Sequence, residues 1–497
     1  MGLSLAAVFL AAFYHENKEG DLRYIAPYYG AAYWLFCSGV ISSLIAGATI
    51  LGEEVDEDED EEFDHLKKPS LVLTGTDNDA FSTESASISG EESTNIALAR
   101  EHYDGDKVFR LKIDSQEKLE LFKSLAGYLD VWKEPRNFED FADVRVSKKE
   151  LDRFEVLLKS KKIQSEIFID NVEEMVEQTF QDVAAGFNDF YDFNYEQYHR
   201  FEDYQEWQAQ FAEINSDLIE IENLGISFEG RALNAMKIGN GSQHIVMHGG
   251  THAREWISPI TMVNFAKQLV DEFRAGGRNA KYLNDITWHI VLNMNPDGYE
   301  YTFTDSRMWR KTRSTNNTPS NCIGVDPNRN WDSCWQCPGA SSNPCNEAYY
   351  GPGAFSEPET KAASDHLKSI SNVRGYVDVH AYGQYWMYPY GYKIAHSQSN
   401  LKLNTISMDA AIAIALVHRK QFKYGTINDV IYQASGSSAD WAYDQANIPC
   451  SFALELRDQG QFGFLLPANQ IKPVAEEMWA GLTIMADAVI AGTCNRK

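Results

Sequence analysis

Two short stretches of the sequence carry side chains that could bind a metal ion. His252 and Glu255 lie three residues apart in HGGTHAREWISP, and His380 ends an apolar run in DVHAY. Two imidazoles and one carboxylate are a common protein ligand set of catalytic zinc, which keeps a fourth position open for water. An HxxE pair is common by chance, and each histidine taken alone is more often a surface or core residue. The pattern predicts a zinc site only if the fold brings the stretches together.

Whether they meet depends on the elements that carry them. Four apolar runs, separated by helical or loop-rich stretches, indicate buried strands at residues 244–249, 288–295, 375–382 and 450–456. Apolar strands interleaved with helices are typical of an α/β fold whose central sheet is covered by helices on both faces. Functional side chains in such sheets gather beyond the strand ends. The two stretches fall there, as does Glu455 in LELRD, so we expect them to converge.

A smaller domain is predicted ahead of this sheet, at residues 103–178. The order strand, helix, strand, strand, helix, strand indicates a small open-sandwich α+β domain. Ser115 and Ser147 are the expected N-caps of its helices. An acidic, aromatic connector at 179–194 leads into the larger domain at 195–497.

The first 102 residues show two compositional extremes. Ile25–Gly52 has no charged residue in 28 positions, which is long enough to cross a bilayer as a helix. We interpret residues 1–52 as a hydrophobic signal or anchor region, with a mispredicted gene start as the alternative. The protein would then be secreted, or held as a type II membrane protein with its larger domain outside. Residues 53–102 follow as an acidic, disordered linker, with ten carboxylates in twelve positions from Glu53 to Asp64.

The overall charge argues against one class of partner. The chain has a formal net charge of -28 at pH 7. A protein that neutralises phosphates needs a basic face, so we expect no nucleic-acid partner.

Six motifs taken together resemble the metallocarboxypeptidases of the A/B type. In chain order they are HGGTHAREWISP, MWRKTRS, GVDPNRNWD, VDVHAYGQ, IYQASGSSADW and ALELRDQGQFGFLLP. The resemblance covers roughly residues 195–491 and implies the mixed central sheet of that family. The small domain resembles the activation segment that precedes the enzyme there, so the chain looks like a whole proenzyme.

The resemblance implies roles for the catalytic centre. It makes His252, Glu255 and His380 the ligands of one zinc ion, and Asp326 the carboxylate that orients the imidazole of His252. Glu455 corresponds to the general base that accepts a proton from the attacking water. The implied activity is the removal of single C-terminal residues from peptides and proteins.

Further positions match residues that hold the substrate. Arg310 corresponds to the group that supports the polarised carbonyl. Asn328 and Arg329 match the clamp for the free C-terminal carboxylate, and Tyr432 matches a mobile tyrosine that closes on the peptide. Two positions match sites further along the substrate: Arg254 and Tyr382.

The side-chain pocket implied by the resemblance is neutral. Ala439 occupies the position at the base of the pocket, where an acidic residue would select lysine and arginine ends. Other pocket positions are also uncharged: Met387, Ile427 and Ala453. We therefore expect preferred substrates to end in aromatic or large aliphatic residues, as in the A-type enzymes.

The connector departs from the family pattern. Between Ile163 and His199 the sequence contains no lysine or arginine. A trypsin-like protease has nowhere to cut in this stretch. We therefore expect an activating protease of another specificity.

The cysteines favour an oxidising compartment. Apart from Cys37 in the apolar run, six remain, an even number compatible with three disulfides. The resemblance pairs Cys322 with Cys345. The pair CWQC at Cys334 and Cys337 could instead mark a redox or zinc site, and the partners of Cys450 and Cys494 stay open.

Two other functions compete with the enzyme. One is a catalytically silent protein of the same fold that binds C-terminal peptides without cutting them. The other is a membrane-tethered interaction protein whose acidic stretch is the working part. The joint presence of ligands, base and electrophile favours the enzyme.

Overall fold

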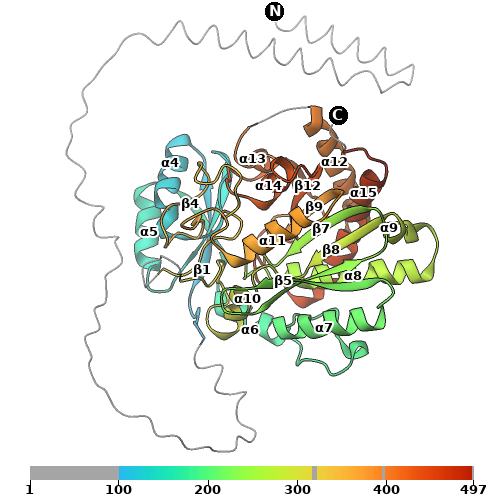
Figure 1. Ribbon diagram of the computed structural model, residues 1–497. Coiled ribbons are helices and arrows are strands. Elements are labelled where there is room, and N and C mark those ends of the chain that lie inside the picture. Colours follow the sequence, from blue (N-terminus) through green and yellow to red (C-terminus); the bar gives the residue numbers. More distant parts are fainter. Residues whose placement is uncertain (1–99, 316–321, 395–397, 495–497) are drawn as a thin grey trace, which may run out of the picture. The chain divides into compact units, whose positions relative to one another are not determined.

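The computed structural model describes residues 100–315, 322–394 and 398–494. They form two β-sheets with their helices, a small sheet first and a large one after it (Figure 1). The expected signal or anchor region at 1–52 lies outside the described residues, as does nearly all of the acidic linker at 53–102. Both therefore stay predictions.

The small sheet has four antiparallel strands in the order β2-β3-β1-β4. The elements are β1 (Lys107–Ile113), α4 (Gln116–Leu125), η4 (Ala126–Tyr128), β2 (Asp130–Lys133), β3 (Asp140–Val146), α5 (Leu151–Ser160) and β4 (Gln164–Ile169). Apolar side chains of β1 and β3 pack under α4 and α5, where the rings of Phe109 and Phe154 meet edge to face. The open-sandwich prediction is confirmed, including the order of its elements.

The two expected helix caps have different outcomes. Ser115 caps α4, because its side chain accepts a hydrogen bond from the amide of Lys118 at 3.3 Å. The prediction for Ser147 is wrong. The amide of Glu150 donates to the carbonyl of Ser147 at 2.8 Å, and this turn delays the start of α5, whose N-cap is Glu150.

A third helix, α6 (Val172–Gln181), was not expected from the sequence. Asn171 caps it by accepting a hydrogen bond from the amide of Glu174. Val172 and Val176 are four residues apart and buried, a helical spacing that could have identified it. The helix runs through the expected end of the small domain at residue 178.

The large sheet has eight strands in the order β11-β10-β12-β9-β7-β8-β6-β5. The strands are β5 (Ile219–Ile226), β6 (Ala232–Ile238), β7 (Gln243–Gly249), β8 (Ile286–Val291), β9 (Val373–His380), β10 (Tyr385–Tyr388), β11 (Lys423–Thr426) and β12 (Cys450–Glu455). The four expected strands are β7, β8, β9 and β12, which pair in parallel at the centre. Antiparallel pairs on either side make the sheet mixed, as expected.

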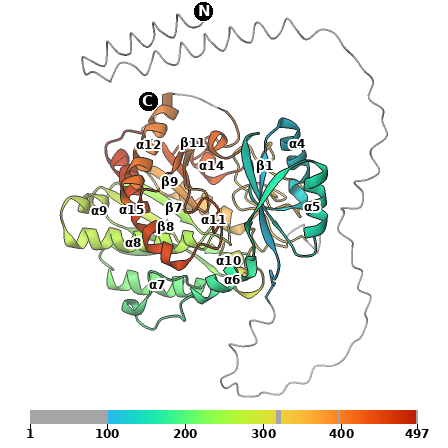
Figure 2. The same ribbon diagram turned by 180° about the vertical axis from the view of Figure 1, so that it is seen from behind.

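Helices cover both faces of this sheet. They are η5 (Phe190–Asp192), α7 (Phe201–Ile214), α8 (Ile257–Ala275), η6 (Arg278–Ala280), α9 (Lys281–Asn284), α10 (Pro296–Thr304), α11 (Pro358–Ser369), α12 (Gln398–His418), α13 (Ile427–Val430), α14 (Ser438–Asp444), η7 (Ala468–Gln470) and α15 (Ile471–Ile490). One core packs under α8, α12 and α15, which face the viewer in Figure 2. The other packs under α11 and α14. The α/β prediction with helices on both faces is confirmed.

Among the described residues, one helix, α12, is both long enough and apolar enough to cross a membrane. Its residues Leu403, Ile406 and Ile414 are buried in the same core as α15. Other apolar residues of the helix, such as Ile412 and Leu416, are exposed. One helix of this length and composition is weak evidence for a membrane span.

An apolar cluster joins the two sheets. Trp132 of β2 packs edge to face on Phe464, with ring centroids 5.3 Å apart. Met308 and Leu465 belong to the same cluster, together with Val176 of α6. Because β2 lies beside the loops that follow the central strands, this contact holds the small sheet against the region where the candidate site residues are expected.

Candidate metal and peptide site

The fold brings the three expected metal ligands together. His252 and Glu255 lie in the turn between β7 and α8, and His380 is the last residue of β9. β7 and β9 are parallel neighbours, so the segments that follow them leave the sheet at the same edge. All three residues are at most 5% exposed.

Their polar atoms form a triangle. The Nδ1 atoms of His252 and His380 lie 3.1 Å apart. The Glu255 carboxylate lies 2.7 Å from Nδ1 of His252 and 3.1 Å from Nδ1 of His380. A tetrahedral zinc ion with Zn–N distances of about 2.0–2.1 Å separates its ligand atoms by about 3.3 Å. The triangle therefore has the size that one zinc ion requires.

Each imidazole has a carboxylate on its far nitrogen. Nε2 of His252 lies 3.1 Å from Asp326, as expected. Nε2 of His380 lies 2.9 Å from Asp378, which the sequence analysis missed. Carboxylates in this position fix the tautomer and the orientation of metal-binding histidines. Asp378 and His380 are two apart on one strand and so share a face, which was the available signal.

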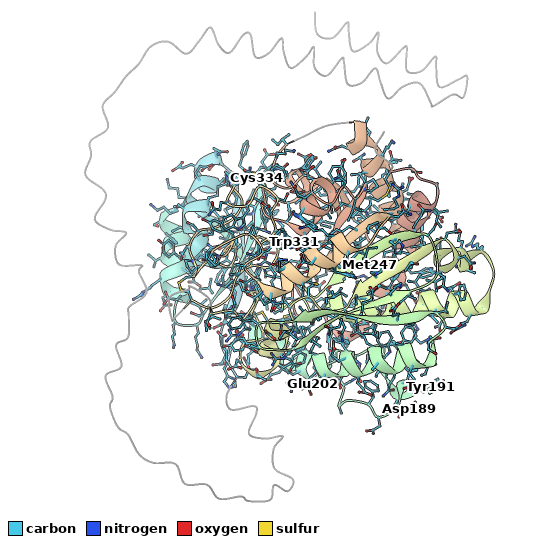
Figure 3. All side chains as sticks on the ribbon, viewed as in Figure 1. Asp189, Tyr191, Glu202, Met247, Trp331 and Cys334 are labelled. Carbon is cyan, nitrogen blue, oxygen red and sulfur yellow. A yellow bond between two sulfur atoms is a disulfide. The ribbon has the colours of Figure 1, made fainter. Side chains whose placement is uncertain are left out.

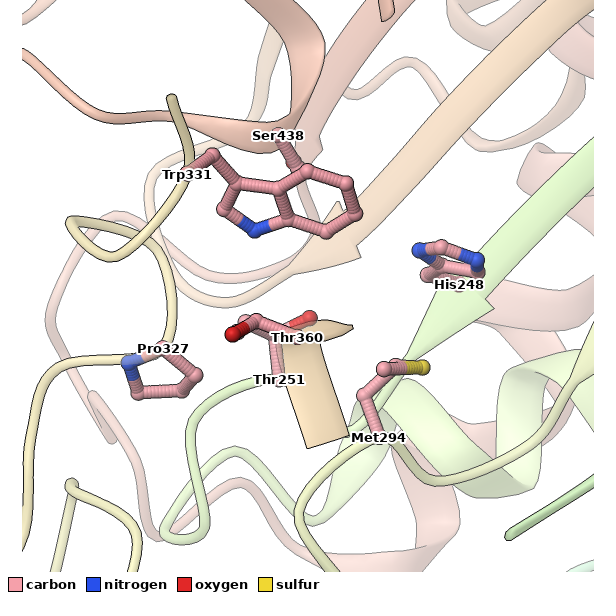
Figure 4. A pocket seen from close by; sticks show the side chains of 7 residues that line it. All are labelled: His248, Thr251, Met294, Pro327, Trp331, Thr360 and Ser438. Carbon is pink, nitrogen blue, oxygen red and sulfur yellow. The ribbon is translucent and has the colours of Figure 1, made fainter. Parts of the chain in front are cut away.

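Asp378 is itself held by two hydroxyl groups. Oγ1 of Thr251 donates to it at 2.9 Å, and Oγ of Ser438 donates to its other oxygen. The two hydroxyl-bearing residues also line a small pocket, together with His248 and Trp331 (Figure 4). Asp378 is thus fixed from the loop after β7 and from α14.

Positive charge between the three ligand side chains would stabilise them. Two Nδ1 atoms at 3.1 Å cannot both present lone pairs to one another. Burial alone would lower the pKa of His380, but the charges of Asp378 and Glu255 raise it well above its ordinary value. A cation between the three ligand atoms meets the same demand. The donor set, two imidazoles and a carboxylate, is one that zinc accepts.

Glu455 lies next to the metal group with one oxygen unpaired. It is the last residue of β12, and β12 pairs with β9 so that Glu455 faces His380 in register. Its Oε2 is buried and has no hydrogen-bond partner among the described residues. Burial, and then the charge of Glu255, raise the pKa of Glu455 to about 8. The carboxyl group lines a pocket shared with Glu255 and Arg310.

Arg310 and Asp326 form a buried ion pair beside the ligands. The guanidinium donates to Asp326 at 2.8 Å. Burial alone would raise the pKa of Asp326, but Arg310 and then His252 hold it well below its ordinary value. Asp326 therefore stays ionised between a cation and an imidazole.

The expected carboxylate clamp is divided between two environments. Arg329 lies near Tyr432, with its Nη2 3.5 Å from the phenol oxygen, and Nε donates to the carbonyl of Gly339. The Asn328 amide nitrogen lies 3.1 Å from Nε2 of His380. Its Oδ1 accepts the amide of Ser438 at 2.9 Å. In this structure Asn328 lies beside a metal ligand and supports the start of α14.

Arg254 and Tyr382 face the small domain. Nη1 of Arg254 lies 3.5 Å from a carboxylate oxygen of Asp130, and its guanidinium lies 4.1 Å from the ring centroid of Phe464. The Tyr382 hydroxyl donates to Asp143 at 3.5 Å. Both positions expected to meet a peptide therefore meet acidic residues of the small domain. The sequence offered no signal for these partners.

The pocket beside the metal group is lined from both domains. Its walls include Glu255, Arg310, Tyr432 and Glu455 of the large domain. The small domain contributes several side chains: Arg110, Trp132, Lys133, Glu134, Asp140 and Phe141. The small domain thus covers the opening beyond the strand ends.

Ala439 lies apart from this lining. It is 1% exposed in the first turn of α14, and its carbonyl accepts a hydrogen bond from Ser451 at 2.7 Å. It belongs to one apolar cluster with the other expected pocket positions, Met387, Ile427 and Ala453. The four positions are brought together, but they are covered by other residues.

All six cysteines among the described residues are paired. The expected disulfide Cys322–Cys345 is present. Cys334, labelled in Figure 3, pairs with Cys337, so CWQC forms a disulfide here. Cys450 at the start of β12 pairs with Cys494 after α15. Three disulfides are consistent with an oxidising compartment.

Two family profiles match the chain. Residues 204–481 match the zinc carboxypeptidase profile, and residues 109–179 match the carboxypeptidase activation peptide. Carboxypeptidase B of Homo sapiens is 38% identical over 403 residues, covering 78% of this chain and 94% of that protein. Carboxypeptidase A2 of Mus musculus is 39% identical over 400 residues, covering 78% and 94%.

Solved structures agree with this match. Thrombin activatable fibrinolysis inhibitor superimposes with a TM-score of 0.72 at 29% identity, covering 78% of this chain and 100% of that one. Carboxypeptidase A from Helicoverpa armigera has a TM-score of 0.72 at 30% identity, covering 78% and 98%. With its activation peptide and a ligand triangle that fits the metal, this chain belongs to the zinc carboxypeptidase family.

Proposed function

We propose that this proenzyme is an extracellular exopeptidase that removes single aromatic or large aliphatic residues from the C-termini of peptides and proteins. In this proposal His252, Glu255 and His380 bind one zinc ion. Glu455 carries the argument, because an unpaired carboxylate oxygen buried beside a metal group is costly unless it acts on a substrate or a water molecule.

The residues have complementary chemical roles. Zinc, when bound, supplies Lewis acidity that polarises a carbonyl and acidifies water. Glu455 accepts the water proton at Oε2 and later returns it to the departing amine. Arg310 donates hydrogen bonds toward the developing oxyanion, and its charge is held in place by Asp326.

The substrate carboxylate would be held by guanidinium and amide groups. Arg329 is buried and lies beside Tyr432, so a carboxylate entering between them meets a cation and a phenol. Asn328 extends the clamp toward the metal ligand His380. Arg254 and Tyr382 would meet the peptide further along once the small domain has left.

The preference for neutral side chains rests on the apolar cluster around Ala439. The four pocket positions of that cluster are uncharged, and the adjacent Asp440 accepts hydrogen bonds from the amides of Gly391 and Tyr392. Burial raises the pKa of Asp440 to about 7, which further reduces its charge. Relatives named carboxypeptidase A and carboxypeptidase B are both similar, so the local chemistry carries this proposal.

A silent peptide-binding protein of the same fold is the rival. It would need the clamp but not a base, an electrophile and a complete ligand triangle together. The pocket contains Glu255, Arg310 and Glu455 side by side. Hydrolysis of blocked dipeptides that stops on addition of a zinc chelator would exclude the rival.

The small domain is proposed to keep the enzyme latent. Asp130 lies at Arg254, and burial raises the pKa of Glu134, whose carboxyl lines the pocket near Arg310 and Arg329. Asp130 of the small domain thus contacts one cation that would receive a peptide, and Glu134 lies near two others. We place the small domain at 103–178, the connector at 179–194 and the catalytic domain at 195–497.

The N-terminal region is proposed to direct the protein to the secretory route. Residues 1–52 would act as a signal, or as a type II anchor that leaves the catalytic domain outside. The three disulfides of the described chain are consistent with this compartment.

Asp326→Asn is expected to lower zinc affinity about 10–100-fold, the usual effect of losing a group that orients a metal ligand. The amide loses the charge that holds His252 and Arg310. Competition between the proenzyme and a chromophoric chelator measures the affinity. Asp332→Asn, at an exposed acid of the same loop, is the matched control. Equal affinities in the two variants would contradict the role of Asp326.

Glu455→Gln is expected to lower kcat of the activated enzyme about 10²–10⁴-fold, because an amide of the same shape cannot accept the proton. Zinc content and KM should change little. Glu476→Gln on the surface of α15 is the control and should keep full turnover. A decrease of less than about tenfold would exclude Glu455 as the base.

Ala439→Asp is expected to shift the ratio of kcat/KM from phenylalanine and leucine ends toward arginine and lysine ends. A buried carboxylate without a partner gains from a cationic substrate side chain. Ala439→Ser changes the volume slightly without adding charge, and its ratio should stay at the original value. If the Asp variant folds poorly, both rates fall together while the ratio still reports specificity. An unchanged ratio would show that Ala439 does not line the pocket.

Activation is expected to follow cleavage in the connector by a chymotrypsin-like protease. Tyr191, labelled in Figure 3, lies in the stretch without lysine or arginine. It is 80% exposed. Tyr191→Ser should slow chymotryptic activation, whereas Tyr128→Ser, at a tyrosine 71% exposed in the small domain, should not. N-terminal sequencing and release of C-terminal phenylalanine are the measurements. Full activity of the uncut protein would contradict latency.

A further inference from the structure

A second group of histidines and a carboxylate lies away from the catalytic centre. Glu222 belongs to β5, His289 to β8 and His366 to the last turn of α11. Glu222 faces Ala235 of β6 in register, and His289 faces Lys237 two residues further along the same strand. Glu222 and His289 therefore share the face of the sheet that α11 covers (Figure 1).

Polar atoms of both imidazoles in this group lie close to the Glu222 carboxylate. One oxygen of Glu222 lies 2.8 Å from Nδ1 of His289 and 3.1 Å from Nε2 of His366. One ligand atom from each residue lies within 4.8 Å of the others. The separations around Glu222 are close to the about 3.3 Å between neighbouring ligands of tetrahedral zinc.

The far nitrogen of His289 has the support that a metal ligand needs. Its Nε2 lies 3.0 Å from Nδ1 of His244, at the start of β7. If Nδ1 of His289 binds a metal, Nε2 carries the proton and donates it to His244. This contact fixes the tautomer in the way that outer partners of metal-bound histidines do.

His366 turns one nitrogen toward the group and leaves the other without a partner. The residue is 8% exposed, and its Nδ1 is buried with no hydrogen bond to the described chain. Nε2 is therefore the nitrogen that makes the polar contact, and it points at the oxygen already contacted by His289. Both imidazoles contact the same carboxylate oxygen, and the three ligand atoms lie close enough together for a cation to be held by all three groups.

The protonation states are compatible with metal binding. Burial lowers the pKa of His289 and of His244, which favours neutral rings with free lone pairs near pH 7. Burial alone would raise the pKa of Glu222, but hydrogen bonds from His289 and then His366 lower it. The group then offers a neutral His289 ring and an ionised carboxylate.

We propose that Glu222, His289 and His366 form a second binding site for a divalent transition metal, zinc being the ion whose ligand preference they match. His244 acts as the outer partner of His289. The Glu222 side chain is 27% exposed, so solvent can complete the coordination. Bound metal would tie the C-terminal turn of α11 to β5 and β8. This site does not share residues with the proposed catalytic site, because its ligands belong to β5, β8 and α11, whereas the catalytic ligands follow β7 or end β9.

The alternative without metal is a chain of hydrogen bonds. A proton on Nδ1 of His289 would be donated to Glu222, and one on Nδ1 of His244 to Nε2 of His289. That arrangement satisfies these groups without an ion. It predicts that the proenzyme binds zinc at the catalytic group only, so the two readings differ in the number of ions bound.

The test counts metal ions in the full proenzyme. The protein is stripped with a chelator, dialysed against buffered Zn²⁺ and analysed for zinc per chain. We expect two zinc ions in the original protein and one in the double variant His289→Gln, His366→Gln. His252→Gln should also retain one, at the second group. His418→Gln, which alters another histidine–glutamate contact on the surface, should retain two and is the matched control.

A second measurement tests the proposal even if the double variant folds poorly. Glu222→Gln changes a half-buried side chain on an edge strand and should lower the affinity for the second zinc ion at least about tenfold. Hydrogen exchange should show added protection of α11 and β5 by zinc in His252→Gln, and none in His252→Gln combined with Glu222→Gln.

Three results would overturn the proposal: one zinc ion in the original protein that is lost in His252→Gln, two ions retained by the double variant, or equal second-ion affinity in Glu222→Gln. Failure of the proposed catalytic ligands would look different. His252→Gln would then bind as much zinc as the original protein.

Discussion

The arrangement of the site depends on one constraint: two imidazole nitrogens and a carboxylate are buried within 3.1 Å of one another. Uncompensated, such a group is costly, because lone pairs and negative charge have been removed from water without a counter-charge. The parallel strands β7 and β9 deliver these atoms to one edge of the sheet, and Asp326 and Asp378 hold the two rings from behind. A cation at the triangle converts this unfavourable arrangement into the organising centre of the site.

Buried charges around the metal group also need partners of opposite charge. Arg310 offsets Asp326, while the oxygen of Glu455 that faces the pocket is left unpaired. In the proenzyme, Asp130 reaches Arg254 and Tyr382 reaches Asp143. The small domain thus places acidic groups against Arg254 and Tyr382, two positions that we propose to meet the peptide. The apolar contact of Trp132 with Phe464 holds it there, so the charge contacts need not be strong individually.

The two histidine groups show how similar donors acquire different surroundings. The catalytic group lies beyond the carboxyl ends of the central strands, next to a pocket and a charged arginine. The group of Glu222, His289 and His366 lies on a sheet face under α11, with no pocket among those described beside it. Position relative to the strand ends therefore separates a site that can receive a substrate from one suited to tying elements together.

What the sequence by itself determined was local or carried by motifs. Apolar runs identified the four central strands, and HxxE, DVHAY and LELRD placed His252, Glu255, His380 and Glu455 at their ends. The sequence did not predict the edge strands, α6 or the late start of α5, because short amphipathic segments and turns give weak periodic signals.

Only the tertiary structure determined which residues far apart in the chain contact one another. The contact of Asp130 with Arg254, the pairing of Cys450 with Cys494, and the meeting of Glu222, His289 and His366 each join residues far apart in the chain. Such contacts depend on strand order and register, and one residue of register shift turns a strand side chain to the other face of the sheet. Local composition does not determine that register, because the register is set only when the whole core packs.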